Sequence, residues 1–130
     1  MKTTSTAHRP LRVLLAGNAP ESSSALANWL SDQDGLHVTG AGRTTAETLA
    51  LATVVRPDVV LLDFHGLPVP ASYTVALFKE LSPAPSVFVL THDASPAMRR
   101  HCRTARVDAI FDKTAELEAL RATLAAAPRR

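Results

Sequence analysis

Five short apolar runs, separated by segments with helical character, constrain the fold more than any other feature of this chain. The runs are LRVLLA (11–16), LHVTGAG (36–42), VVLLD (59–63), SVFVLT (86–91) and VDAIFDK (107–113). Apolar strands that alternate with helices are typical of a parallel sheet covered by helices on both faces. The sequence therefore predicts an α/β protein of five β–α units, in one domain of 130 residues that is long enough to bury a core.

The segments between these runs carry helix start patterns. Asn18 and Thr44 each stand three residues before a glutamate, the spacing of a capping box. Ser95 precedes a proline that suits the first helical position, and Thr114 is the expected cap of the last helix. We interpret Trp29 and Tyr73 as core or helix-packing residues. Apolar residues with helical spacing mark the five helices: Ala25, Leu26, Trp29 and Leu30; Leu49, Ala50 and Val54; Tyr73, Ala76, Leu77 and Leu81; Met98, Cys102 and Ala105; Leu117, Leu120 and Leu124.

Composition excludes several classes of protein. The net charge of +2 is too small to indicate nucleic-acid binding by itself. The single cysteine, Cys102, excludes an intrachain disulfide and a CxxC metal site. The chain has neither an apolar run long enough to span a membrane nor a signal peptide, so we expect a cytoplasmic protein. We predict a flexible leader over 1–9, a folded domain over 10–126 and a basic tail over 127–130.

Three polar residues stand where predicted strands end. Asp63, Thr91 and Lys113 close the third, fourth and fifth runs. Open parallel sheets place their binding sites at the carboxyl ends of the strands. Each residue alone has a simpler explanation, as a loop cap, a strand-end hydroxyl or a solvated charge. Their shared position favours a site in which a carboxylate nucleophile is assisted by a hydroxyl and an amine.

The motifs PDVVLLD, VFVLT and AIFDK, in this order, resemble those of the receiver domain of bacterial two-component response regulators. The similarity extends over about residues 10 to 125. It implies a flavodoxin-like (βα)5 three-layer sandwich with a parallel sheet of order 2-1-3-4-5. It also implies that Asp63 accepts a phosphoryl group from a histidine kinase or phosphotransfer protein. Thr91 matches the hydroxyl that turns toward that group, and Lys113 matches the lysine that contacts it.

The chain departs from the receiver pattern in several places. Receivers carry an acidic pair after the first strand, which helps to hold magnesium, whereas this chain has Gly17 and Asn18 there. The proline that usually follows the aspartate by four residues is Pro68, five residues on. The aromatic switch position, three residues before the lysine, holds Ile110.

The missing acids change the expected charge of the site. Asp63 against Lys113 has a net charge near zero, so we expect a direct ion pair between them in the resting protein. Asp63, the Asn18 amide oxygen and the His65 backbone carbonyl would form at most a weak Mg²⁺ site.

Two kinds of output follow from the resemblance. The chain is either a stand-alone regulator that is phosphorylated on Asp63, or a phosphorylation-independent adaptor, which Ile110 favours. In both cases it is a signalling protein rather than an enzyme, and it acts on a downstream protein target. No effector or DNA-binding domain is expected after residue 125.

The fourth predicted helix and its exit are rich in arginine. In receivers the surface formed by helix four, strand five and helix five binds partners or makes homodimers, so we take Arg99, Arg100, Arg103 and Ile110 as candidate partner-binding residues. A solvated helix face is the simpler explanation of the arginines. Their functional interpretation is recognition of an acidic protein surface.

Other functions have less support. DFHGLP is similar to the D-x-H-x-x-G motif of cobalamin-binding domains, but a proline stands in place of the glycine. His65, His92, Asp63 and Asp93 leave a transition-metal site as an alternative. The glycines form neither a P-loop nor a dinucleotide fingerprint.

Overall fold

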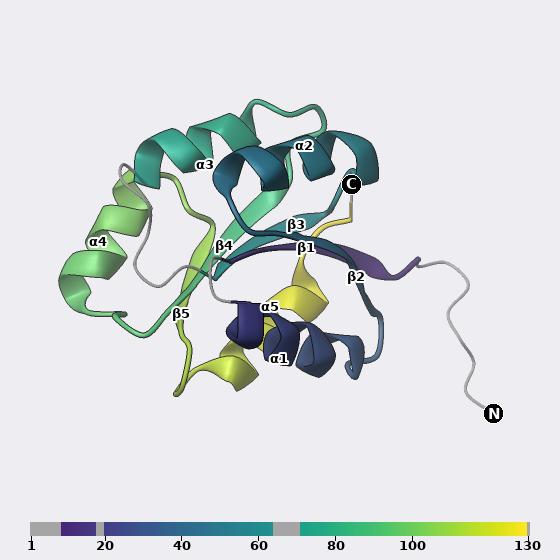
Figure 1. Cartoon of the computed structure of the whole chain (residues 1–130). Coiled ribbons are helices and arrows are strands. Elements are labelled where there is room, and N and C mark those ends of the chain that lie inside the picture. Colours follow the sequence, from purple (N-terminus) through teal and green to yellow (C-terminus); the bar gives the residue numbers. More distant parts are fainter. Residues whose placement is uncertain (1–8, 18–19, 64–70, 130) are drawn as a thin grey trace.

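Strands and helices alternate along the whole described chain. The computed structural model describes residues 9–17, 20–63 and 71–129. The elements, labelled in Figure 1, are β1 Leu11–Gly17, α1 Pro20–Ser31, β2 Leu36–Gly42, α2 Thr45–Val55, β3 Val59–Asp63, α3 Ala71–Lys79, β4 Ser86–Thr91, α4 Pro96–Thr104, β5 Ala109–Asp112 and α5 Leu117–Ala126.

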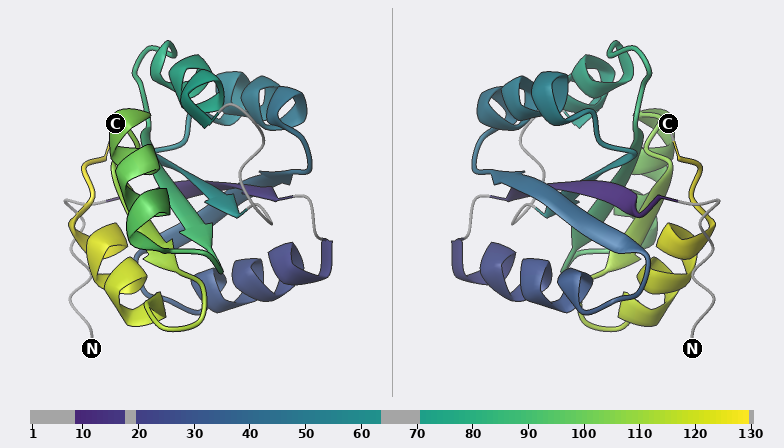
Figure 2. Two further views of the ribbon diagram at one scale, coloured as in Figure 1. Left: turned by 90° about the vertical axis from the view of Figure 1, so that its left-hand side faces the viewer. Right: turned by 90° about the vertical axis from the view of Figure 1, so that its right-hand side faces the viewer.

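The five strands form one parallel sheet of order β2-β1-β3-β4-β5. Helices α1 and α5 cover one face of this sheet, and α2, α3 and α4 cover the other (Figures 1 and 2). The predicted flavodoxin-like (βα)5 fold and its strand order are confirmed. The fifth strand is shorter than predicted, because it spans only Ala109–Asp112 and Lys113 follows it.

The core lies in two layers, one on each face of the sheet. Val13 and Leu15 of β1 pack on the side of α1 and α5, whereas Leu14 and Ala16 pack on the side of α2 and α3. Successive side chains of a strand point to opposite faces, so a central strand covered on both sides must be apolar at nearly every position. This is why the central strands are continuous apolar runs in the sequence.

The predicted helix starts are confirmed at two helices and wrong at a third. The Thr44 side chain accepts the Glu47 N–H at 3.0 Å, and Ser95 accepts the Met98 N–H at 3.2 Å. Thr114 does not cap α5, which begins at Leu117. The turn before α5 is instead organised by the carboxylate of Asp112.

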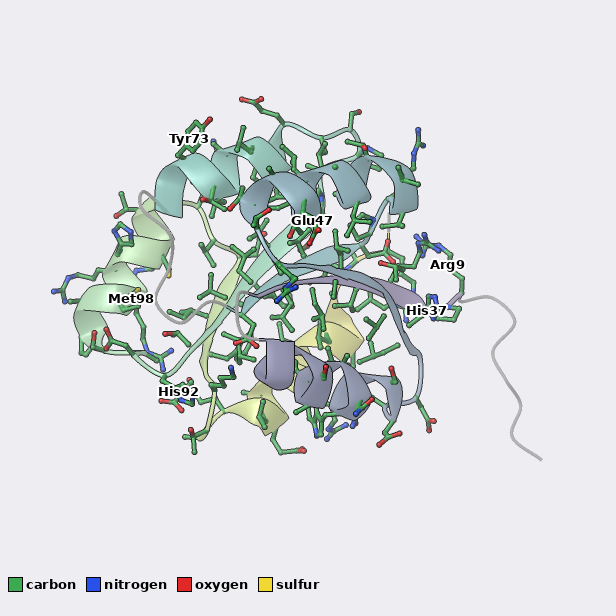
Figure 3. All side chains as sticks on the ribbon, in the orientation of Figure 1. Arg9, His37, Glu47, Tyr73, His92 and Met98 are labelled. Carbon is green, nitrogen blue, oxygen red and sulfur yellow. The ribbon has the colours of Figure 1, made fainter. Side chains whose placement is uncertain are left out.

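The interpretation of Tyr73 as a core or helix-packing residue is wrong. Val54 and Tyr73 are 79% and 62% exposed, and Tyr73 points outward from α3 (Figure 3). The buried positions are Thr48 and Ala52 in α2 and Thr74, Val75 and Phe78 in α3. Helix α2 presents small side chains to the sheet because its backbone approaches β2 closely. The predicted faces of α4 and α5 are confirmed at Cys102, Ala105, Leu120 and Leu124, which are all buried.

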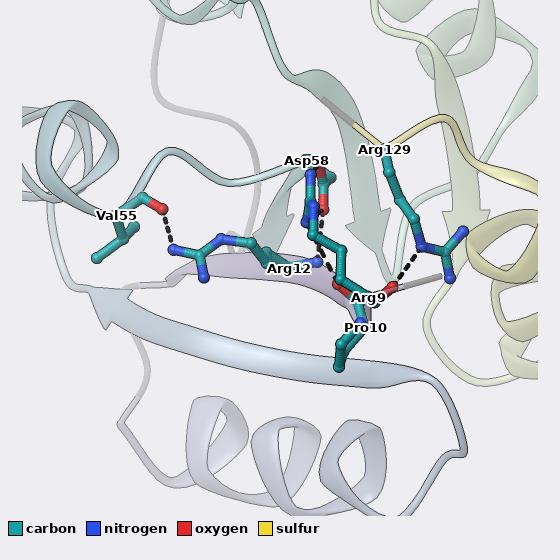
Figure 4. Close-up of polar contacts among 6 residues, drawn as sticks. All are labelled: Arg9, Pro10, Arg12, Val55, Asp58 and Arg129. Carbon is teal, nitrogen blue, oxygen red and sulfur yellow. Dashed lines mark hydrogen bonds and ion pairs between the residues drawn. The ribbon is translucent and has the colours of Figure 1, made fainter. Parts of the chain in front are cut away.

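Both ends of the described chain contact the body of the domain (Figure 4). The Arg9 guanidinium donates two hydrogen bonds of 2.8 Å to the fully buried carboxylate of Asp58, which also accepts the Arg12 N–H at 2.8 Å. Arg129 donates to the Arg9 carbonyl at 2.8 Å. The predicted domain boundaries after residues 9 and 126 remain predictions. Arg9 and Arg129 lie in the predicted leader and tail, and the hydrogen bonds described here fix both side chains.

Within the described residues, no helix combines the length and apolarity that crossing a bilayer requires.

Candidate functional site

The carboxyl ends of β3, β4 and β5 bring the three predicted site residues to one edge of the sheet. Asp63 is the last residue of β3, Thr91 is the last of β4, and Lys113 directly follows β5. Strand β3 is buried at all five positions, so it forms a rigid support for the Asp63 carboxylate. Asp63 and Thr91 are themselves each only 3% exposed.

Asp63 and Lys113 form a close ion pair. The Lys113 Nζ lies 2.7 Å from Asp63 Oδ1, with side-chain exposures of 22% and 2% respectively. A carboxylate at this depth remains charged only when a cation or hydrogen-bond donors replace the lost water. The direct ion pair expected from the sequence is therefore present.

Thr91 holds the two loops that border this pair. Its hydroxyl oxygen accepts the Asp93 N–H at 3.0 Å, and its carbonyl accepts the Lys113 N–H at 2.8 Å. The Lys113 backbone is thus fixed to β4. The hydroxyl still carries its own proton, which it can donate to a neighbouring oxygen.

A second polar network, which the sequence did not predict, joins α4 to the turn after β5. Glu116 accepts hydrogen bonds from Arg99 Nη2 at 2.7 Å and from the Asp112 N–H at 2.8 Å. These two bonds hold the pKa of Glu116 below its ordinary value, with the Arg99 bond as the larger cause. Arg99 also donates to the Ala94 carbonyl at 3.0 Å. The signal in the sequence was a carboxylate in the turn just before the last helix, close to an arginine-rich segment.

Asp112 completes this turn. Its carboxylate accepts the N–H groups of Ala115 and Thr114, each at 2.8 Å, and these bonds lower the Asp112 pKa. The turn that carries Lys113 is therefore tightly ordered on both sides of the lysine.

The candidate partner-binding residues are in different environments. Arg99 is half-buried and paired with Glu116, Ile110 is half-buried against the core, and Arg100 and Arg103 are exposed on α4. Their role in partner binding stays a prediction.

The described part of the site has too few oxygen ligands for a magnesium ion. Two of the three expected ligand residues, Asn18 and His65, lie outside the described residues. Gly17 is the register neighbour of Asp63 and has no side-chain oxygen. Nowhere in the described ranges do three His, Cys, Asp or Glu side chains gather into a metal-binding group. The residues described here leave Asp63 as a single carboxylate already paired with Lys113, which does not fit the ion.

The alternative transition-metal site gains no support from its described members. His92 and Asp93 are exposed, and His92 Nδ1 lies 3.5 Å from the Thr114 hydroxyl. Asp63 is engaged with Lys113, and His65 is outside the described residues. Cys102 is buried in the core, where burial raises the pKa of its thiol.

A shallow pocket of about 210 Å³ opens beside the ion pair, between α1 and α5. Its walls are mostly apolar, and Lys113 forms part of its rim. The lining residues are Ala25, Leu26, Trp29, Leu90, Lys113 and Leu117. Lys113 therefore borders an apolar surface on this side.

Comparison with known proteins supports the architecture described above. No protein-family model matches the chain. A protein-glutamate methylesterase/protein-glutamine glutaminase of Anaeromyxobacter dehalogenans is 32% identical over 85 residues, which are 65% of this chain and 25% of that protein. The chain thus spans about a quarter of the length of this relative.

Solved receiver structures superpose on nearly the whole chain. The receiver domain of the putative response regulator NarL of Mycobacterium tuberculosis has a TM-score of 0.76 at 18% identity, over 90% of this chain and 98% of that one. The response-regulator domain of Thermotoga maritima CheB has a TM-score of 0.71 at 17% identity, over 91% and 92%. The Vibrio cholerae chemotaxis protein CheY4 has a TM-score of 0.70 at 21% identity, over 92% and 99%. This chain has the fold of response-regulator receiver domains.

Proposed function

We propose that this protein is a response-regulator receiver that accepts a phosphoryl group on Asp63. The donor is a histidine kinase or phosphotransfer protein, and the output is a contact with a downstream protein. The observation that carries the proposal is the buried Asp63–Lys113 pair, 2.7 Å apart, beside Thr91 at the carboxyl edge of the sheet.

The chemistry proceeds by a single displacement at phosphorus. A carboxylate oxygen of Asp63 attacks the phosphorus of a phosphohistidine, and the P–N bond breaks. The histidine nitrogen takes the electron pair of that bond, and the product is an acyl phosphate on Asp63. The Lys113 ammonium stabilises the charge on the phosphoryl oxygens, and the Thr91 hydroxyl can donate to one of them.

Phosphorylation would change the balance of contacts at this edge. The phosphoryl group adds roughly 1.5 to 2 negative charges by analogy with other phosphorylated side chains. Lys113 is then shared between the carboxyl and phosphoryl oxygens, and Thr91 is drawn toward the new acceptor. Because Thr91 also bonds to Asp93 and Lys113 backbone groups, its movement would be transmitted to both loops.

A phosphorylation-independent interaction module is the second candidate. It is favoured by Gly17 beside Asp63, since the neighbouring strand brings no acid to the site. It is also favoured by Ile110, which replaces the aromatic side chain that the resemblance associates with switching. In this alternative the Asp63–Lys113 pair is a structural ion pair.

The two candidates are separated by a phosphorylation assay. We expect incubation with a phosphorylated kinase or with acetyl phosphate to add one phosphoryl group to the intact protein, as measured by mass spectrometry. Asp63→Asn should abolish the addition, whereas Asp93→Asn, a control at an exposed neighbouring aspartate, should not. An unmodified wild-type protein under conditions that phosphorylate another receiver would favour the interaction module.

Stand-alone action, dimerisation through α4, β5 and α5, and a cytoplasmic location complete the proposal. Measurement of oligomeric state before and after phosphorylation tests the dimer.

A further inference from the structure

A second pocket lies at the opposite end of the sheet from Asp63. It has a volume of about 430 Å³ and opens between the α1–β2 turn and the end of α5. Its lining includes Leu36, the first residue of β2, whereas Asp63 is the last residue of β3. Because β1, β2 and β3 are parallel, the pocket and the candidate phosphoacceptor lie at opposite edges of the sheet. The proposed phosphoryl transfer therefore makes no use of this pocket.

The two walls of this pocket carry opposite charges. Asp32 and Asp34 belong to the turn between α1 and β2, whereas Arg121 and Arg129 belong to α5 and the segment after it. No carboxylate oxygen of these aspartates lies within 4.0 Å of a guanidinium nitrogen of these arginines. The pocket thus keeps two acids and two bases apart, with open space between them.

Both walls are fixed by hydrogen bonds. The Gly35 carbonyl in the turn accepts the Leu11 N–H at 2.8 Å, which ties the backbone of the acidic wall to β1. On the other wall, Arg129 Nε donates to the Arg9 carbonyl at 2.8 Å, and its two Nη groups make no hydrogen bond to a described residue (Figure 4). A pocket whose walls are already in place loses little entropy when a ligand binds.

Helix stability does not explain the two aspartates. Helix α1 ends at Ser31, so Asp32 and Asp34 follow its carboxyl end, where the helix dipole is negative and favours cations. The last turn of α1 contains no basic residue that would compensate them. This wall therefore attracts a cationic group.

Arg121 remains able to bind a carboxylate although it is paired with Glu118. The two side chains are 47% and 79% exposed, and ion pairs so exposed to water are weak. Only Nε and Nη2 of Arg121 donate to Glu118, which leaves Nη1 without a hydrogen bond to a described residue. The arginine wall therefore offers donors from both Arg121 and Arg129 to an anionic group.

We propose that this pocket binds a small zwitterion of the amino-acid class. Its ammonium group lies toward Asp32 and Asp34, and its carboxylate lies toward Arg121 and Arg129. An ion of a single sign would be attracted by one wall and repelled by the other, because the charges of the two walls cancel. The volume is within the range of small-molecule sites, about 300 to 1,000 Å³. A metal ion fits less well, since the described residues contain no group of three His, Cys, Asp or Glu side chains that could hold one.

An NMR titration tests the ligand class and the location together. The ¹⁵N-labelled full chain is titrated at low ionic strength with glycine, 4-aminobutanoate and 6-aminohexanoate, which differ in the distance between their two charges. Hexanoate and hexylamine, which each carry one of the charges, are the matched controls. We expect saturable amide shift changes in residues 32–36 and 121–129. At least one zwitterion should bind about tenfold or more tightly than either control.

Substitutions on the two walls should change the ligand preference in different ways. Asp34→Asn should reduce the preference for the zwitterion over hexanoate, whereas Arg121→Gln should reduce the preference over hexylamine. A general disturbance of the fold would not separate these two preferences, and well-dispersed spectra verify that the variants are folded. Asp93→Asn and Arg43→Gln, at exposed positions elsewhere, should leave binding unchanged. Asp63→Asn should also bind normally, so this test is independent of the phosphorylation assay.

Three results would overturn the proposal. The first is binding of hexanoate or hexylamine as tight as that of every zwitterion, which would indicate a simple ion site. The second is the absence of saturable shift changes with all three zwitterions. The third is equal loss of binding in the wall variants and in the control variants.

Discussion

Gly17 lies directly beside Asp63 in the parallel register of β1 and β3. The strand that borders the candidate phosphoacceptor therefore contributes no side-chain oxygen at this level of the sheet. On the other side of the site, Lys113 Nζ lies 2.7 Å from Asp63 Oδ1. The described site thus compensates the charge of its buried carboxylate with a lysine, without a further acidic side chain from β1.

Removal of the lysine should destabilise the fold. Lys113→Met leaves the Asp63 charge at a site that is 2% exposed without its ammonium partner. We expect a loss of about 3 kcal/mol in the free energy of unfolding, which urea denaturation measures. Lys113→Met combined with Asp63→Asn should recover most of the loss, because a neutral amide does not require a cation. A single Lys113→Met variant as stable as the wild type would mean that the pair contributes nothing.

Magnesium should stabilise the resting protein very little. A ligand that binds the folded state raises stability according to its concentration relative to Kd, so thermal unfolding in increasing Mg²⁺ reports the affinity. We expect Gly17→Asp to increase this response, because it adds a carboxylate beside Asp63. A sodium chloride titration of the same variant at matched ionic strength controls for general screening. A strong response of the wild type to Mg²⁺ would show that groups outside the described residues complete a site.

The Arg99–Glu116 pair should make stability depend on acid pH. The pKa of Glu116 is lowered from its ordinary value of 4.5, chiefly by the hydrogen bond from Arg99. A lowered pKa in the folded state means that the stabilisation is present above pH 4.5 and is lost as the pH falls through the folded-state pKa. Glu116→Gln should therefore lose stability relative to wild type at neutral pH and approach it in acid. Urea unfolding at several pH values measures this, and a difference independent of pH would contradict it.

The contact between Arg9 and Asp58 should matter for stability even though Arg9 precedes the first strand. Arg9→Ala removes two charge-assisted hydrogen bonds of 2.8 Å from a carboxylate that is fully buried. We expect a loss of about 2 kcal/mol, measured by denaturant unfolding. Arg56→Ala is a suitable control, since it removes another exposed arginine from the same end of the sheet. Identical stabilities of the Arg9 variant and the wild type would indicate that the Arg9–Asp58 contact does not stabilise the fold.

The end of β2 should not tolerate a side chain at Gly42, because helix α2 lies directly against that position. A Cβ atom at Gly42 would lie 2.8 Å from the Thr48 backbone, whereas one at Gly40 would meet only the Leu14 side chain at 3.4 Å and Leu51 at 4.0 Å. Gly42→Ala should therefore destabilise the protein by about 1–3 kcal/mol. Gly40→Ala, the same substitution in the same strand, should have a much smaller effect. Similar unfolding free energies for the two variants would contradict this packing.

The order of strands and helices could be predicted from the apolar runs in the sequence, because buried central strands must be apolar on both faces. The runs at 11–16, 59–63 and 86–91 match β1, β3 and β4 to within a residue. The starts of α2 and α4 could also be predicted, from the capping patterns at Thr44 and Ser95, since a cap depends on atoms only three residues apart.

Helix orientation was less predictable where hydrophobicity was spread around the helix. Tyr73 was interpreted as a packed residue but is exposed on α3, because the sequence does not reveal which side of a helix meets the sheet. Thr48 and Ala52 face inward because β2 comes within contact of α2 at Gly42.

The positions of Asp63, Thr91 and Lys113 at the ends of strands were determined by the sequence, and parallel pairing of those strands was enough to bring them to one edge. Only the tertiary structure decided that Arg99 pairs with Glu116 while Arg100 and Arg103 remain exposed. The order of charged residues along a helix does not show which of them pairs with a carboxylate from a turn that is distant in the sequence. That pairing depends on the packing of α4 against β5, which brings Arg99 to the turn that precedes α5.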